Sequence, residues 1–172
     1  MSAAAQLCLQ CGLCCNGVLF SDVELRAGDK ATQLTSLGLD IFRKGRKQAF
    51  TQPCKCLERD LCSIYANRPM QCRAFECTQL RLVDQGAKPL SAAERKIREA
   101  KRLAGEVAQL CRDLGHGDET VPLNRRYAAI MSEPMDLAGD ERGVELRGEL
   151  MLAVGKLVEV LERDFLRAAV KE

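Results

Sequence analysis

The chain has 172 residues, of which 47% are hydrophobic, and its 26 Lys and Arg against 24 Asp and Glu leave a formal net charge of +2. A chain of this length and apolar content can bury the core of one domain without covalent cross-links. This nearly balanced charge differs from the strongly basic composition expected of a nucleic-acid-binding protein. We therefore expect a single domain, residues 1–172, that depends neither on a disulfide framework nor on nucleic acid.

The N-terminal stretch MSAAAQL carries neither the basic segment nor the apolar core of a secretory signal. No run of the sequence approaches the roughly 18 apolar residues that a membrane-spanning helix needs. We expect a soluble, cytoplasmic protein without a membrane partner. Cysteines stay reduced in that compartment, so a dense group of them indicates metal binding or redox chemistry rather than disulfides.

Nine of the ten cysteines lie within residues 1–80, which we interpret as a cysteine-cluster metal-binding region. Four of them fall in the stretch CLQCGLCC, residues 8–15. The candidate metal ligands are Cys8, Cys11, Cys14, Cys15, Cys54, Cys56, Cys62, Cys72 and Cys77.

The sequence of this region predicts little regular secondary structure. Residues 17–25 mix β-branched and aromatic side chains and predict a strand or one arm of a hairpin. Residues 29–38 predict a short helix with Asp29 as its N-cap and Gly38 at its end. The stretch 50–77 has no sustained apolar period, which is typical of a segment organised by bound metal.

The spacing of the first cysteines fits two kinds of metal site. Cys8, Cys11 and Cys14, three apart in series, resemble the three-ligand corner of an iron–sulfur cluster, and each CxxC pair also supplies half of a zinc site. Side chains of adjacent residues diverge in most backbone conformations, so Cys14 and Cys15 indicate that one of them serves a second metal or bridges two.

The number of thiols leaves the arrangement open. Nine can fill two four-cysteine sites with one left over, or a polynuclear cluster with bridging sulfurs. We favour zinc, with more than one ion per chain, because the thiols exceed the needs of one cubane and zinc accepts all-cysteine tetrahedra. An iron–sulfur cluster is the alternative cofactor.

Residues 90–172 read as a helical region. An amphipathic helix over 91–114 opens with Ser91 and Glu94 in capping-box spacing. A shorter helix follows over 123–133, and a third runs over about 140–169. The predicted fold class is mainly α, with a small irregular, metal-organised cysteine-rich region and C-terminal antiparallel helices packed beside it.

CLQCGLCC followed by PCKCLERDLCSIYANRPMQCR resembles the CxxCxxCC family of cysteine-cluster proteins, the YkgJ-like proteins described as zinc- or iron-chelating domains. The resemblance covers residues 8 to about 77 and leaves the helices from 91 onward outside. It implies metal binding by these cysteines and no particular reaction. Related modules occur in flagellin lysine methylases, but the sequence has no S-adenosylmethionine-binding pattern to support that activity.

Other polar and sulfur-bearing residues have simpler interpretations. Cys111 lies on the apolar stripe of a helix and is expected in the core. His116, the only histidine, is expected in a solvated loop. Tyr65 and Arg68 are expected to shape the turn between two cysteines. The basic run RKGRK, residues 43–47, is expected to be a solvated loop or to offset the negative charge of a metal–thiolate cluster.

Three classes of function fit these observations. The leading one is a metal-binding protein whose cysteine cluster is structural, carries metal or senses it. The alternatives are an iron–sulfur redox or catalytic protein, and a zinc module that docks nucleic acid or a protein partner. The sequence has no HExxH, P-loop or comparable catalytic motif, so it assigns no reaction. Metal ions are the one partner that we expect.

Overall fold

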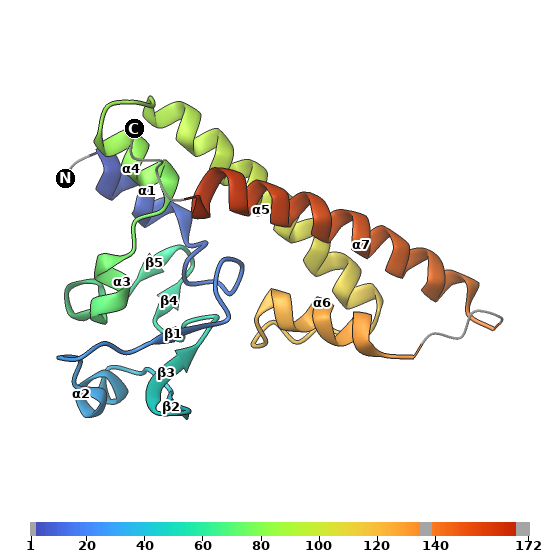
Figure 1. Ribbon diagram of the computed structural model, residues 1–172, viewed down its shortest axis with the longest axis horizontal. Coiled ribbons are helices and arrows are strands. Elements are labelled where there is room, and N and C mark those ends of the chain that lie inside the picture. The colour runs from blue at the N-terminus through green and yellow to red at the C-terminus, as the bar shows by residue number, and fades with distance from the viewer. Residues whose placement is uncertain (1–2, 135–138, 168–172) are drawn as a thin grey trace.

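The computed structural model describes residues 3–134 and 139–167. Two long helices, α5 (Leu90–Asp113) and α7 (Glu141–Leu161), run antiparallel and extend away from the cysteine-rich region, which lies at one end of them (Figure 1). Helix α6 (Leu123–Ser132) packs against both. Most of the regular structure is therefore α-helical, as the sequence predicts.

The apolar stripe of α5 forms the main core. Its buried side chains recur at the spacing of a helix face and are Ala93, Ile97, Ala100, Leu103, Ala104, Val107 and Cys111. Leu150 and Leu157 of α7 and Ile130 of α6 pack into the same core, and each buried leucine contributes about 1.5–3 kcal/mol. Leu7 and Leu13 belong to this core too, so the first cysteine segment is anchored on the long helices.

The cysteine-rich region is built from short elements. They are α1 (Ala3–Cys11), β1 (Asp22–Glu24), α2 (Ala31–Ser36), β2 (Ile41–Lys44), β3 (Lys47–Thr51), β4 (Leu57–Glu58), β5 (Leu61–Cys62), a 3-10 turn (Tyr65–Asn67), α3 (Met70–Ala74) and α4 (Thr78–Asp84). Strands β1, β3 and β2 form an antiparallel sheet in that order, with Val23 opposite Phe50. A second core cluster lies here and contains five buried residues, Val23, Leu34, Leu39, Phe50 and Cys56.

Residues 50–77 contain more hydrogen-bonded structure than their lack of period indicated. The β4–β5 hairpin and α3 both lie in this stretch. The predicted helix over 29–38 is shorter, α2, and its end near Gly38 is confirmed by the positive φ of that glycine, 103°. Asp29 is not the N-cap. Its carboxylate instead accepts hydrogen bonds from the backbone N–H groups of Arg26 and Met70, at 2.8 and 2.9 Å.

The long helices differ from prediction mainly at their ends. Helix α5 begins one residue early, after Pro89, and no side chain caps it, so the predicted capping box of Ser91 and Glu94 is wrong. Asp140 does cap α7, where its Oδ1 accepts a hydrogen bond from Gly143 N at 2.8 Å. The α-helical conformation ends at Leu161 and passes into a π-helical turn, η2 (Glu162–Leu166), while the predicted end near residue 169 lies outside the described residues.

Among the described helices, none combines the length and the apolar character needed to cross a membrane.

Candidate metal centre

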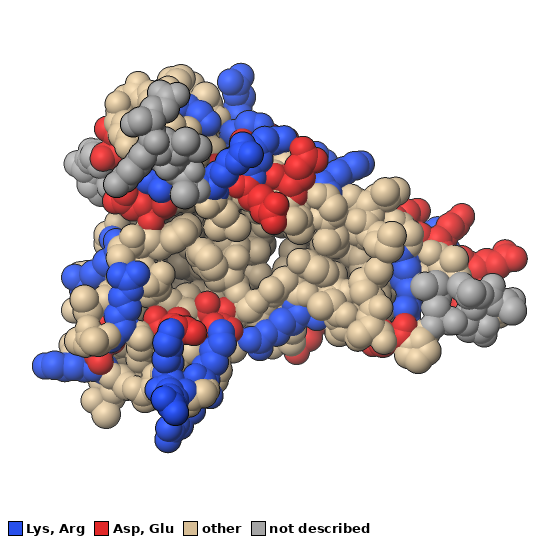
Figure 2. Space-filling view, in the orientation of Figure 1, with Lys and Arg blue, Asp and Glu red and all other residues tan. Residues whose placement is uncertain are grey.

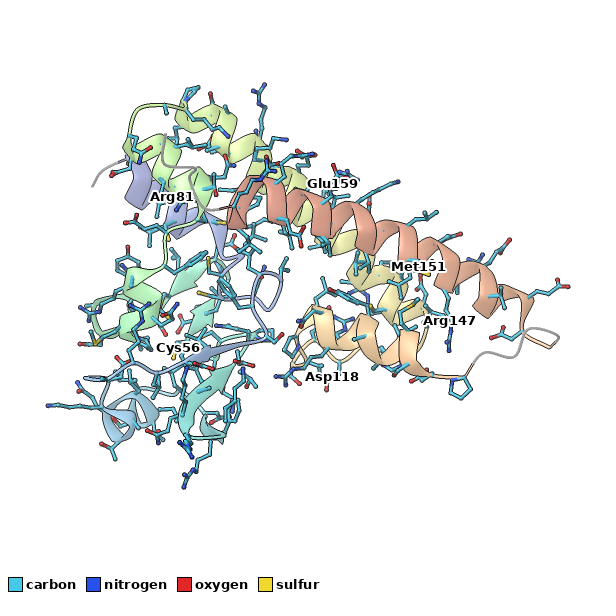
Figure 3. The ribbon with its side chains drawn as sticks, in the orientation of Figure 1. Cys56, Arg81, Asp118, Arg147, Met151 and Glu159 are labelled. Atoms are coloured by element: carbon cyan, nitrogen blue, oxygen red, sulfur yellow. The ribbon has the colours of Figure 1, made fainter. Side chains whose placement is uncertain are left out.

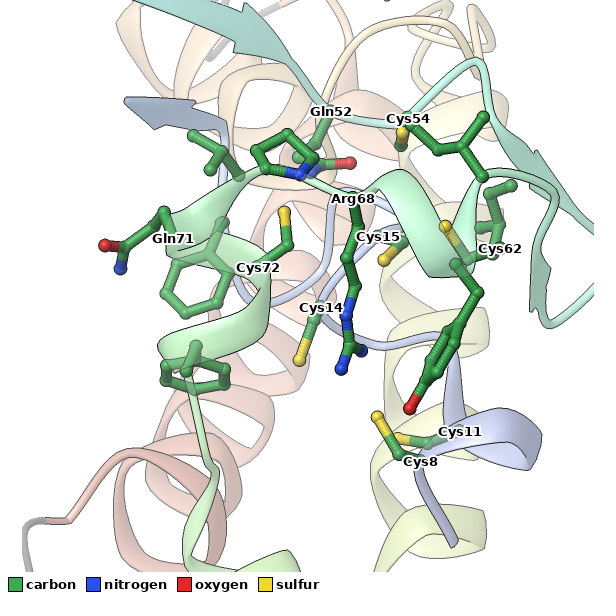
Figure 4. Close-up of a pocket in the computed structure, with 18 of the residues that line it drawn as sticks. Cys8, Cys11, Cys14, Cys15, Gln52, Cys54, Cys62, Arg68, Gln71 and Cys72 are labelled. Atoms are coloured by element: carbon green, nitrogen blue, oxygen red, sulfur yellow. The ribbon is translucent and has the colours of Figure 1, made fainter. Parts of the chain in front are cut away.

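Eight of the nine clustered cysteines line one cavity of about 420 Å³ between α1, the short strands and α3 (Figure 4). They are Cys8, Cys11, Cys14, Cys15, Cys54, Cys62, Cys72 and Cys77. The rest of the wall is largely apolar and includes the aromatic side chains of Phe20, Phe50 and Phe75. The tertiary fold thus brings together thiols that are up to 69 positions apart in the sequence, as the numbers of Cys8 and Cys77 show.

The first four thiols are placed by the end of α1 and the turn that follows. Cys8 and Cys11 are three residues apart on α1 and therefore share a helix face. Gly12 ends the helix with φ +69°, and a Cβ at this position would lie 2.8 Å from Asp60 Oδ1. Gly12 O then accepts hydrogen bonds from the backbone N–H of Cys15, at 2.8 Å, and of Asn16, at 3.0 Å. This tight turn presents Cys14 and Cys15 to the cavity.

Of the two central thiols, Cys54 is held by a backbone hydrogen bond to that turn and Cys62 by a short hairpin. Cys54 N donates to Cys15 O at 2.7 Å, which joins the two cysteine segments directly. Cys62 lies on β5 and pairs with Leu57 of β4. The turn of this hairpin contains Arg59, which has a positive φ of 60°. The irregular spacing of these cysteines in the sequence thus reflects a short hairpin that returns the chain to the cavity.

The last two thiols lie on different helices. Cys72 is in α3, which begins directly after Pro69, and Cys77 directly precedes α4. The extended backbone of Phe75 separates the two helices, so Cys72 and Cys77 do not lie on successive turns of one helix. Helix α4 packs against α1, which brings Cys77 toward Cys8.

The thiols fall into two sets according to which of them repel one another electrostatically. Burial is the largest cause of each raised pKa, and after it the charges of neighbouring thiolates raise the pKa further. In every pair within each set, the charge of at least one thiolate raises the pKa of the other thiol. The first quartet is Cys8, Cys11, Cys14 and Cys77. The second quartet is Cys15, Cys54, Cys62 and Cys72.

The two quartets adjoin each other. The neighbouring residues Cys14 and Cys15 belong to different quartets, yet the charge of Cys15 raises the pKa of Cys14. The charge of Cys8 likewise raises the pKa of Cys15, and the charge of Cys62 raises the pKa of Cys8. The sequence indicated that the side chains of Cys14 and Cys15 diverge. We therefore assign these two thiols to different sets within one cavity. Within the part of the chain that the structure describes, no three His, Cys, Asp or Glu side chains converge closely enough to hold one metal ion.

Burial raises the pKa of several cavity thiols and keeps them protonated at neutral pH. It raises the pKa of Cys11, Cys15 and Cys54 to about 12 and that of Cys72 to about 11. A metal that binds must displace those protons, because the thiolate is the ligand. As a donor set, two adjoining groups of four soft sulfurs fit all-cysteine zinc tetrahedra and also iron–sulfur clusters.

Two polar side chains in the cavity wall were not predicted as part of the site. Arg68 projects among the labelled sulfurs (Figure 4), and its Cζ lies 3.9 Å from the centroid of the Tyr65 ring. Gln52 is 1% exposed, and its Oε1 accepts no hydrogen bond from any described group. The sequence offered no clear signal for Gln52, whereas Arg68 lies in the recognisable stretch IYANRPMQC.

The basic run RKGRK forms the exposed turn between β2 and β3, where Lys and Arg side chains gather on the surface (Figure 2). Lys44 Nζ lies 2.6 Å from Asp22 Oδ1, and Lys47 Nζ lies 2.5 Å from Glu24 Oε2. Both carboxylates belong to residues that line the cavity. This run therefore pairs with nearby carboxylates rather than with the thiols.

Three remaining candidates lie outside the cavity. Cys56 is 3% exposed, packs in the second core cluster, and donates a hydrogen bond from Sγ to Leu37 O at 3.4 Å. Figure 3 shows it in the part of the molecule that holds the short strands. Cys111 is fully buried in the main core, as predicted. His116 is in the loop after α5, where its Nε2 lies 2.8 Å from Glu133 Oε1.

Comparison with known proteins agrees with the geometry of the cavity. Residues 7–112 match the family model CxxCxxCC, described as a "putative zinc- or iron-chelating domain". The match extends past residue 77, where the sequence motif ended, and includes nearly all of α5. No curated protein and no solved structure matches the chain. Because the family model covers more than half of the sequence and all eight cavity cysteines, the chain belongs to the CxxCxxCC family of zinc- or iron-chelating domains.

Proposed function

We propose that the chain binds two metal ions through its eight cavity cysteines, one ion in each quartet, and that zinc is the preferred ion. The observation that carries this proposal is the gathering of eight thiols around one cavity, a number that fills two sites of four. Four thiolates are the full ligand set of a structural zinc ion. A two-site protein also accounts for the Cys14–Cys15 doublet, because each quartet takes one of the pair.

The ions supply positive charge that makes eight closely packed thiolates tolerable. Without metal, burial and mutual repulsion both favour the neutral thiols. With metal, each quartet closes around its ion, since Zn–S bonds of about 2.3 Å are much shorter than the span of the cavity. We expect this closure to stabilise the cysteine-rich region, whose own core cluster contains five buried residues.

An exchangeable ion in the first quartet fits a carrier or sensor better than a purely structural role. Cys8 is the one exposed ligand of the first quartet, in which Cys11 is buried, whereas the second quartet has no exposed thiol. An incoming chelator or acceptor thiol can therefore reach the first quartet without unfolding the region. We expect a chelator to remove the two ions in two phases, with the first-quartet ion leaving first.

An iron–sulfur protein is the second candidate, and the open cavity favours it. The thiols surround about 420 Å³ and do not converge on a point. An iron–sulfur cluster brings its own sulfides and fills such a space with less movement of the protein than bare zinc ions require. An iron–sulfur cluster would also allow a redox function.

Anaerobic purification without chelators, followed by elemental analysis, acid-labile sulfide analysis and a visible spectrum, tests the proposal. We expect a colourless protein with two zinc ions per chain. Cys72→Ser should lose one ion, and Cys111→Ala, which removes a core thiol outside the cavity, should lose none. A brown protein with matching iron and sulfide would replace zinc by the second candidate. A protein free of zinc and iron would refute both.

A further inference from the structure

Arg68 lines the same cavity as the eight thiols. Its side chain projects into the space among the labelled cysteines (Figure 4), and its charge acts on a thiol of each quartet, Cys8 and Cys72. In the described part of the chain, no carboxylate forms an ion pair with it, and its recorded side-chain contact is with the ring of Tyr65. An unpaired guanidinium in a largely apolar wall needs a negative partner.

The proposed metal centre supplies that partner. Eight thiolates and two divalent ions carry a net charge of about −4, and this charge would be partly buried. A fixed cation between the two quartets lowers the electrostatic cost of both sites at once. Arginine suits the position because its guanidinium stays charged and stacks on an aromatic ring.

Other nearby cations are already engaged. Lys101 Nζ, which acts on Cys11, lies 2.9 Å from Asp60 Oδ2. Arg81, near Cys77, donates a hydrogen bond from Nη2 to Arg167 O at 2.7 Å. The two lysines of the RKGRK run are paired with Asp22 and Glu24. Among the described residues, Arg68 is the only Lys or Arg in the cavity wall, and no carboxylate neutralises it.

We propose that Arg68 is a positioning residue that serves as the shared counter-charge of the two quartets and strengthens the binding of both ions. The inference rests on the proposed two-ion function. It gives the RPMQC stretch a role beyond shaping the turn, because Arg68 and Cys72 then act in the same centre. An organic anion held by Arg68 is the competing explanation, but it would add negative charge to a cavity that the metal-bound thiolates of the proposed centre already make negative.

Competition with a chromophoric zinc chelator measures the effect on each ion. Arg68→Gln should weaken the binding of both ions by about 10-fold or more, in the range found for residues that support metal ligands. Arg68→Lys keeps the charge and should recover most of this loss. Arg46→Gln is the matched control, because it removes the same charge from the exposed turn between β2 and β3 and should change the affinities by less than about twofold.

The outcomes separate this inference from the function on which it rests. If the wild-type protein binds no zinc or iron, the proposed function itself fails. If the wild-type protein binds two ions and Arg68→Gln binds them equally well, only the role of Arg68 is refuted. An Arg68→Lys variant as weak as Arg68→Gln would refute it too, since charge would not be the property that matters. Helical circular dichroism of each variant checks that it is folded, and Arg68→Lys alone can overturn the inference if the glutamine variant does not fold.

Discussion

Paired cysteine replacements test the division of the cavity into two quartets. Cys8→Ser with Cys77→Ser removes two thiols from the first quartet, whereas Cys72→Ser with Cys77→Ser removes one from each. None of these three side chains is in the fully buried core, so serine is tolerated at each position without a large packing defect. Both double variants retain six cavity cysteines of the eight. The total number of thiols is therefore equal, and only their distribution differs.

The expected loss of zinc affinity is estimated by dividing the free energy of zinc binding equally among the four thiolate ligands of a site. Structural zinc sites in small peptides bind with about 10–16 kcal/mol, so each of four similar thiolates accounts for about 2.5–4 kcal/mol. The loss of one thiolate thus weakens a site by about 10²–10³-fold. The within-quartet variant should keep one ion at wild-type affinity, because the second quartet is intact. The across-quartet variant should keep no ion at wild-type affinity.

Native mass spectrometry in zinc-buffered solutions resolves these cases, because it counts the ions on each folded chain as free zinc is lowered. Cys111→Ala serves as the control and should match the wild-type protein. The division is wrong if the across-quartet variant retains one ion of wild-type affinity and the within-quartet variant retains none. Equal behaviour of the two variants would indicate a single cluster that shares all eight thiols.

Metal removal, alkaline pH and Cys56 provide three further tests. Chelation should make residues 50–77 sensitive to protease while the helical circular dichroism of α5 and α7 largely persists, and complete loss of the helical signal would contradict this. Burial raises the pKa of Cys11, Cys15 and Cys54 to about 12 in the folded chain, so the metal-free fold binds more protons than the unfolded chain above about pH 9. Its urea midpoint should therefore be steady below pH 9 and fall as pH rises toward 12, and a midpoint that rises over this interval would refute the assignment. Cys56→Ala should retain two ions but lower the free energy of unfolding by about 1–2 kcal/mol, through the lost packing and the lost hydrogen bond to Leu37 O, and loss of an ion would make Cys56 a ligand.

The local geometry of the sequence predicts more than one set of thiols but does not predict their membership. Adjacent cysteines diverge, and this alone separates Cys14 from Cys15 in the sequence. The partner of each depends on long-range packing. Cys77 joins Cys8 because α4 packs against α1, and it separates from Cys72 because the chain is extended at Phe75. No spacing rule within the sequence contains that information.

The long helices were predicted well because their apolar period is strong, while their ends were predicted less well. At the start of α5, Ser91 and Glu94 have the spacing of a capping box, but Pro89 precedes the helix and sets an earlier start. The short elements between residues 50 and 77 had no pattern to reveal them. A two-residue strand such as β4 is fixed by its partner β5 and by the tight turn at Arg59, not by periodicity.

The location of the basic side chains relative to the thiols is the feature that the sequence predicted least well. RKGRK is the densest basic run among the first 80 residues, yet its lysines lie on a surface turn and pair with carboxylates. Arg68, a single cation between an asparagine and a proline, projects into the cavity. A surface charge is screened by water and salt, whereas a charge in a partly buried cavity acts strongly over the same distance. The electrostatic effect of a residue therefore depends on its burial, so we expect the partly buried guanidinium of Arg68 to affect the proposed metal binding more than the four exposed cations of the RKGRK run.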